Sequence, residues 1–258
     1  MTWGTLHYES GTNTKQEQKI ANLRKQLHLL VTGLVFPTTM TSEQRIRFQS
    51  GIFLDINSNS KSVPQNVLMH IKRIQLPIDD ESIAQFVIES LNKQGIFKGL
   101  LQISSLENGK IRTASIVRFA LRYLVTVKPT EGRKSLFEFW DGDKLAVIGM
   151  ENKALHDYVQ FCSDTLRAYF GAIKMNMPEY WNVTDSMLLS VISINGFIIA
   201  LTRQLSVNGV KDFPFYNNVF CGWRYDFSKD KFEFTSSQYR KFSGIILENA
   251  FKLSPSIY

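Results

Sequence analysis

The sequence predicts an α+β fold that is mostly helical. Two observations lead to this prediction for the 258 residues. Long segments of the C-terminal part repeat apolar residues every three or four positions, which is the period of an α-helix. Short apolar runs stopped by turn-forming residues occur in both parts of the chain, as expected for strands. We expect an α/β portion over residues 1–76 and a helical region over residues 77–258.

In the N-terminal part, helical periodicity, proline stops and capping residues delimit the elements. Pro37 ends an apolar triplet, and Thr41 or Ser42 can cap a following helix. The predicted elements are, in order, a helix over 15–34, a strand over 34–36, a short helix from 41 or 42 to 49, a short buried strand or helix end over 53–56, and a helix over 64–75.

In the helical region, Asp, Ser or Thr precedes most apolar repeats, and Gly or Pro follows them. We expect the two longest helices to pair as the hub of this region, with Phe161, Phe170 and Ile198 buried where they meet. The predicted elements are a helix from 79 or 80 to 94, a strand over 100–104, a basic helix over 113–125, a weakly alternating segment over 136–140, helices over 154–175 and from 184 or 185 to 205, an aromatic-rich, turn-broken segment over 213–234, and a last helix from 236 or 237 to 252.

One short motif resembles a known family. The run from Phe53 to Val63 reads Phe-x-Asp-Ile-Asn-x-x-x-Lys-x-Val, and a short helix pattern over 42–48 precedes it. Both features are similar to those of bacterial DGQHR-domain proteins, which include the DndB-type regulators of DNA phosphorothioation clusters. The Asp-Gly-Gln-His-Arg signature of that family lies upstream of the motif, and residues 1–50 contain no match to it.

The resemblance implies a partial DGQHR domain, with a ParB-like fold, over residues 1–76. It implies a DNA-associated, non-catalytic regulator or accessory factor of a bacterial DNA phosphorothioation system. Two alternatives stay open: a ParB-like hydrolase of ATP or CTP, and a truncated family member that acts through protein contacts only. The expected partners are double-stranded DNA, proteins of the modification system, or further copies of this chain.

The charge distribution predicts where DNA would bind. The chain has 30 Lys and Arg against 23 Asp and Glu, and most of this excess falls between Lys110 and Lys134. A basic stripe on a helix suits phosphate contacts, which supply affinity rather than sequence choice. The alternative is a solvated helix face, or pairing of the arginines with Glu138, Asp141 or Asp143. The residues expected to contact nucleic acid are Lys110, Arg112, Arg118, Arg122 and Lys128.

Asp55 and Asn57 are the polar residues that interrupt and end the apolar run from Phe53 to Ile56. In an alternating segment both side chains would point to the same side, where they could face a ligand pocket. The alternative, which we favour, is that they pin the turn over 58–62 through hydrogen bonds to its backbone.

The remaining patterns argue against catalysis and against a membrane. The four histidines, His7, His28, His70 and His156, show no metal-ligand spacing, and no phosphate-binding glycine loop is present. We therefore expect no catalytic residues, no metal and no cofactor. Cys162 falls on an apolar helix face, which predicts a buried reduced thiol. Residues 1–13 lack a secretory signal pattern, so we expect a cytoplasmic chain.

Overall fold

The computed structural model describes residues 35–57, 77–102, 111–130, 132–235 and 237–254, together with positions 19, 22, 23, 25, 33 and 71. The chain divides into two units, residues 1–41 and 42–258. In the first unit, the described positions 19, 22, 23 and 25 are helical. Most of the helices predicted over 15–34 and 64–75 lies outside the described residues. The boundary predicted between residues 76 and 77 adjoins such a stretch and stays a prediction.

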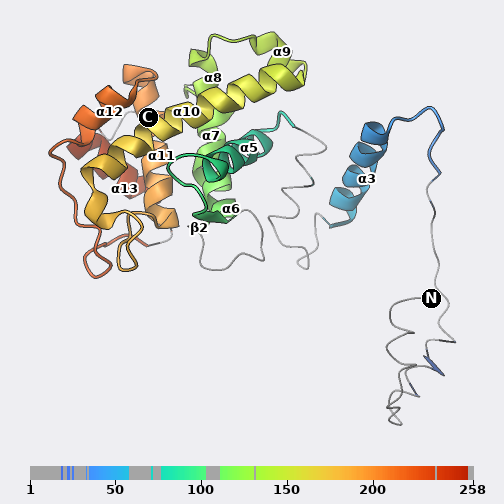
Figure 1. The fold of residues 1–258 in the computed structure, drawn as a ribbon, viewed down its shortest axis with the longest axis horizontal. Coiled ribbons are helices and arrows are strands. Elements are labelled where there is room, and N and C mark those ends of the chain that lie inside the picture. Colours follow the sequence, from blue (N-terminus) through green and yellow to red (C-terminus); the bar gives the residue numbers. More distant parts are fainter. Residues whose placement is uncertain are drawn as a thin grey trace. The chain divides into compact units, whose positions relative to one another are not determined.

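The described part of the second unit is mostly helical, as predicted (Figure 1). Its α-helices are α3 (Ser42–Asn57), α5 (Asp80–Lys93), α6 (Thr113–Ile116), α7 (Arg122–Val125), α8 (Leu136–Phe139), α9 (Lys144–Ile148), α10 (Asn152–Asn176), α11 (Val191–Asn208), α12 (Phe213–Phe220) and α13 (Tyr239–Ile245). The other elements are the π-helical segments η1 (Val117–Leu121) and η3 (Ile246–Ala250), the 3-10 helix η2 (Pro178–Tyr180), and the strands β1 (Leu101–Gln102) and β2 (Ile111–Arg112).

Capping explains where the helices begin and end. The Asp79 side chain accepts a hydrogen bond from the backbone N–H of Glu81, so α5 starts at the predicted place. Gly95 follows the end of α5 with a φ of 87°, a left-handed conformation that glycine adopts at little cost. The strand predicted over 100–104 is present as β1, whose Leu101 is paired in parallel with Ile111 of β2.

The predicted basic helix over 113–125 is a single helical stretch. It runs through α6, η1 and α7 without a break, and its middle turn is π-helical. The last helix has the same construction, since α13 leads directly into η3. A π-helical turn is rare and occurs frequently at functional sites, because it displaces the side chains that follow it.

The two longest helices, predicted to pair as the hub of this region, meet less extensively than expected. α10 packs mainly against α5 and α12, whereas α11 packs mainly against α13 and η1. The two helices meet at one place, where the Tyr169 hydroxyl donates to the Phe197 carbonyl at 3.1 Å. Phe170 and Ile198 are buried there as predicted, but Phe161 is only half-buried.

Several local predictions differ from the structure. The weakly alternating segment over 136–140 contains the helix α8. Residues 35 and 36, part of the strand predicted over 34–36, are not in a strand. The helix α11 begins at Val191, because the Ser190 side chain caps it, while residues 186 and 187 are engaged in backbone contacts with 227 and 228. The helix predicted to end at 49 continues to Asn57 as α3. Of the two alternatives for residues 53–56, the helix end is therefore correct, but Ile56 is 72 % exposed rather than buried.

The aromatic segment over 213–234 belongs to the core. Tyr216, Phe220 and Phe227 are fully buried, and Trp223 is nearly so. Phe220 and Trp223 contact Phe197 edge-on, which is an arrangement that aromatic quadrupoles favour, whereas Phe227 is stacked on Phe197. Tyr216 contacts Tyr169 edge-on. This cluster fills the space that α10, α11 and α12 enclose.

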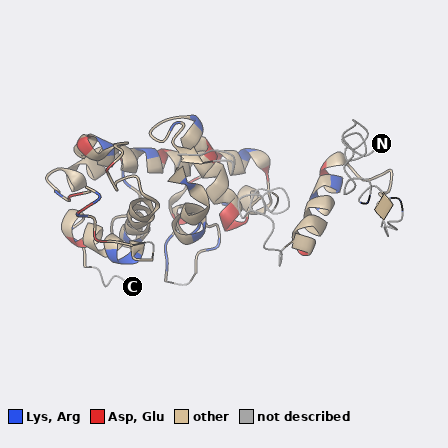
Figure 2. Ribbon diagram, turned by 90° about the horizontal axis from the view of Figure 1, so that it is seen from below, with Lys and Arg blue, Asp and Glu red and all other residues tan. Residues whose placement is uncertain are grey.

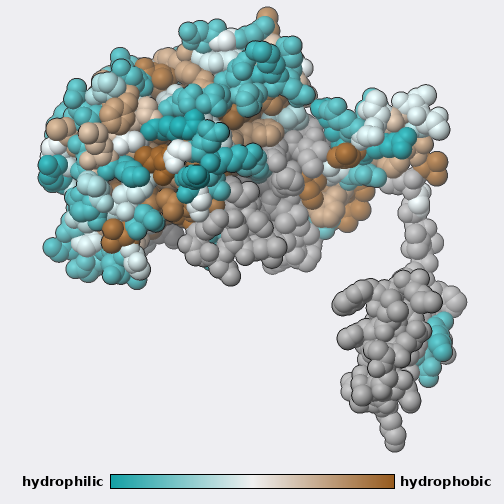
Figure 3. Space-filling view, in the orientation of Figure 1, coloured by the Kyte–Doolittle hydropathy of each residue, from teal (hydrophilic) through white to brown (hydrophobic). Residues whose placement is uncertain are grey.

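The surface is mixed in character. Figure 2 shows lysine, arginine and acidic residues distributed over the helical region, and Figure 3 shows hydrophobic residues interspersed with hydrophilic ones on one face. Among the described residues, no helix combines the length and the apolar character needed to span a bilayer.

We predict that the loss of unfolding free energy on truncating a core side chain increases with the burial of that side chain. Phe170→Ala should cost about 3–5 kcal/mol of unfolding free energy and Ile198→Ala about 2–5 kcal/mol, because both leave a cavity at the meeting point of α10 and α11. Phe161→Ala should cost clearly less than Phe170→Ala. Urea denaturation of the three variants measures this, and equal losses for the two phenylalanines would contradict the packing described.

A second prediction concerns the two cysteines, which are both free. Cys162 is buried, and burial raises the pKa of its thiol, whereas Cys221 is exposed. A thiol reagent should therefore modify Cys221 in the native protein and Cys162 only after unfolding. Mass spectrometry of the labelled peptides identifies the site. Rapid native labelling of Cys162 would show that this part of the core is open.

Candidate nucleic-acid interface

The predicted basic stripe is only partly an open surface. Arg112 ends β2 and is exposed, Lys128 is exposed beyond α7, and Lys110 lies outside the described residues. Arg118 and Arg122 lie four positions apart on the stretch of η1 and α7. Both face the beginning of α5, where acidic side chains contact them.

The acidic partners of these arginines differ from the predicted Glu138, Asp141 or Asp143. Arg122 Nη1 donates to Glu81 Oε1 at 3.1 Å, and Arg122 Nε lies 3.9 Å from Asp80 Oδ2.

Arg118 makes the weaker contact, with its Nε 3.9 Å from Glu81 Oε1. The Glu81 side chain is only 12 % exposed, so its carboxylate needs these cations to offset its lost hydration.

Burial and the same contacts shift the pKa values of Asp80 and Arg122. Burial raises the pKa of Asp80, the neighbouring Asp79 carboxylate adds to the rise, and Arg122 opposes it. Burial alone would lower the pKa of Arg122, but its hydrogen bond to Tyr123 and the charges around it raise that pKa on balance. Arg122 is therefore a permanent cation at the start of α5.

Asp55 and Asn57 lie in the last turn of α3. They are two positions apart on a helix, so they do not share a face as they would in an alternating strand. Asn57 Nδ2 donates to the Phe53 carbonyl at 2.8 Å, a contact that binds one of the last carbonyls of the helix. The proposed ligand role of the pair stays a prediction, and the turn over 58–62 lies outside the described residues.

A basic and aromatic cleft adjoins the predicted stripe. It has a volume of about 250 Å³ and lies between the stretch of η1 and α7, the segment after it, α11 and α13. The charged side chains among the described residues that line it are all arginines, which favours an anionic ligand. The lining residues are Phe119, Ala120, Tyr123, Arg133, Ile199, Thr202, Arg203 and Arg240.

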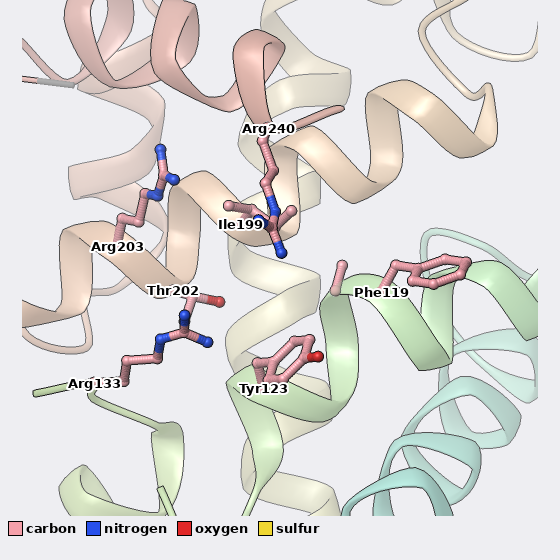
Figure 4. Close-up of a pocket in the computed structure, with 8 residues that line it drawn as sticks. Phe119, Tyr123, Arg133, Ile199, Thr202, Arg203 and Arg240 are labelled. Atoms are coloured by element: carbon pink, nitrogen blue, oxygen red, sulfur yellow. The ribbon is translucent and has the colours of Figure 1, made fainter. Parts of the chain in front are cut away.

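The arginines reach the cleft from separate elements (Figure 4). Arg240 of α13 extends across Ile199, and Arg133 extends toward Thr202 from the opposite side, with the Tyr123 ring nearby. Arg203 turns toward α13, where its Nη1 donates to Ser243 Oγ at 3.3 Å. Arg133 and Arg240 are both exposed and thus accessible to a dissolved anion.

Tyr123 connects the cleft to the ion pairs behind it. Arg122 Nη2 donates to the Tyr123 hydroxyl at 2.8 Å, and the Arg122 guanidinium lies 4.7 Å from the centre of the Tyr123 ring. The Arg133 guanidinium lies 5.8 Å from the same ring centre. Arg122, which Glu81 holds, therefore positions the aromatic wall of the cleft.

A second groove is larger but differently charged. It lies between α5 and the first half of α10, with a volume of about 510 Å³. Glu89, Lys93 and His156 are among its lining residues, so both signs of charge face it. An extended polyanion would meet repulsion from Glu89 there, which makes the basic and aromatic cleft the better phosphate site.

Sequence reasoning missed this cleft. Arg203 and Arg240 are remote in sequence from the basic run that ends at Lys134, and neither belongs to a motif. Arg133 belongs to that run, but it was not among the residues expected to contact nucleic acid. Only the packing of α11 against η1 and α13 brings the three arginines to one place.

The arrangement is suited to binding an anion beside a flat ring. Three guanidinium groups and two aromatic rings supply charge, hydrogen-bond donors and stacking surface. Among the described residues, no group of His, Cys, Asp and Glu could hold a metal ion.

Comparison with family models, curated proteins and solved structures found no match to this chain. The resemblance to the DGQHR family accordingly stays an expectation from the sequence.

We predict different roles for the two arginines of the stripe. Arg122→Ala should lower the free energy of unfolding by about 1–3 kcal/mol, because it leaves the poorly hydrated Glu81 carboxylate short of its closest cation. Arg118→Ala should cost less than about 1 kcal/mol, since its contact is longer and more exposed.

Urea denaturation measures both changes, with the exposed Lys128→Ala as the control, expected within about 0.5 kcal/mol of the parent. A loss on Arg122→Ala no larger than that of the control would show that the ion pair with Glu81 contributes nothing to the fold.

Proposed function

We propose that this chain is a non-catalytic, DNA-associated protein that holds DNA phosphates through the arginines of the basic and aromatic cleft. The observation that carries the proposal is the convergence of Arg133, Arg203 and Arg240 on a cleft with no acidic lining residue among those described. Arginine suits this role because its planar guanidinium donates two hydrogen bonds to one phosphate.

The finer role rests on the resemblance of residues 43–68 to the DGQHR family. On that basis the chain is a regulator or accessory factor of a bacterial DNA phosphorothioation system, acting in the cytoplasm, with a partial ParB-like portion over 1–76. Contacts with other proteins of that system, or with further copies of the chain, belong to the same proposal. Among the described residues, no specific observation favours the nucleotide-hydrolase alternative.

The cleft also changes which arginines are expected to bind phosphate. The stripe hypothesis assigned phosphate contacts to Arg118 and Arg122, whose side chains are engaged with Glu81 and Asp80. A phosphate would have to compete with those carboxylates for the same donors. The described residues that line the cleft include three arginines and no carboxylate.

The salt dependence of binding tests this proposal. Each phosphate neutralised by a protein cation contributes about 0.9 to the magnitude of the slope of log affinity against log salt for duplex DNA, or about 0.7 for a single strand. Changing Arg133 and Arg240 together to Gln should therefore reduce that magnitude by about 1.4 to 1.8. Fluorescence anisotropy of labelled DNA over a series of salt concentrations measures the slope.

The matched control is the double change of Lys98 and Lys229 to Gln, which also removes two exposed cations but none from the cleft. Its slope should equal that of the parent. If the control variant loses as much slope as the cleft variant, binding follows net charge alone and the proposal fails.

A further inference from the structure

We infer that the cleft accepts an unstacked base, together with its flanking phosphates, from a single strand of DNA. This inference rests on the proposed association with DNA and specifies the form of DNA that the cleft recognises. Its basis is the combination of arginines with an exposed aromatic surface at one place.

The aromatic surface is formed by Phe119 and its neighbour in space, Tyr239. Phe119 lies in the π-helical segment η1 and is 46 % exposed, although it is a large apolar side chain. Its ring is stacked on that of Tyr239, with the ring centres 6.2 Å apart and the planes inclined by 25°. Phe119 lines the cleft directly, and Tyr239 directly precedes the lining residue Arg240. The stacked pair therefore borders the cleft.

Such a surface matches a nucleobase rather than a phosphate alone. Bases stack on aromatic side chains whatever their identity, because every base has a flat π-face. In a duplex these faces are covered by neighbouring bases, and only the base edges and the backbone are offered to a protein. A single strand, or a base turned out of a duplex, can contact Phe119 and the arginines together.

The size of the cleft is consistent with one unstacked base and its flanking phosphates. Its volume of about 250 Å³ lies below the range of about 300–1,000 Å³ typical of small-molecule pockets. Arg133 and Arg240 approach it from different elements, which suits phosphates on the two sides of a bound nucleoside. Tyr123, held by Arg122, adds a second ring to the lining.

The test compares three labelled probes at low salt: a short oligothymidine strand, a strand of equal length and charge built from abasic sites, and a duplex of equal length. The oligothymidine should bind at least about fivefold more tightly than the abasic strand, because a stacked base contributes roughly 1 kcal/mol or more. Phe119→Ala should remove this difference without changing the salt slope, since no charge is lost.

Two further variants keep the test decisive. Phe119→Leu retains apolar volume but lacks the ring, so it should show the same loss even if Phe119→Ala is unstable. Phe213→Ala is the matched control, because Phe213 is a similarly exposed phenylalanine, at 38 %, that does not line the cleft. The control should bind all three probes as the parent does.

Equal affinity for the oligothymidine and the abasic strand, with binding that still weakens on changing Arg133 and Arg240, would overturn this inference and leave the proposed function standing. A duplex that binds more tightly than the oligothymidine would overturn it as well. Failure of all three probes to bind at low salt would instead overturn the proposed function.

Discussion

The cluster of aromatic rings around Phe197 of α11 is the constraint on which the arrangement of the helices depends. Phe197 is fully buried. Each such aromatic contact contributes about 0.5–1.5 kcal/mol beyond the burial of its area. Gly196 allows the close approach of α13, since a Cβ at this position would lie 2.4 Å from Phe242 Cδ1. The rings within contact of Phe197 are those of Tyr169, Phe170, Phe220, Trp223, Phe227 and Phe242.

The cleft is a consequence of this packing. Phe197 and Ile198 are held in the core, whereas Ile199 and Arg203, four positions apart on the same helix, are only partly buried and line the cleft. A separate set of polar contacts holds the opposite wall, which is formed by η1 and α7. There Arg122 donates hydrogen bonds both to Glu81 at the beginning of α5 and to Tyr123. The two walls are therefore set by different interactions, one apolar and one ionic.

The sequence predicted where the helices lie along the chain better than it predicted which helices pack against one another. Periodicity and caps placed α5 and α10 and the basic stretch over 113–125 well, because these signals are local. The two long helices meet less extensively than predicted, since α10 and α11 carry apolar residues for several partners at once. For the site, the stripe of Arg118 and Arg122 was visible in the sequence, but its acidic partners at the start of α5 and the arginines at 203 and 240 come from remote segments.

Photo-cross-linking to a short single strand that carries a photoreactive thymidine analogue tests the central claim most directly, because it identifies the residues beside the bound base. Mass spectrometry of the attached peptides should find the cross-links at Phe119, Tyr123 or Tyr239, and they should weaken in the variant with Arg133 and Arg240 changed to Gln. Cross-links confined to the groove between α5 and α10, or unchanged in that variant, would contradict the assignment of the cleft as the DNA site.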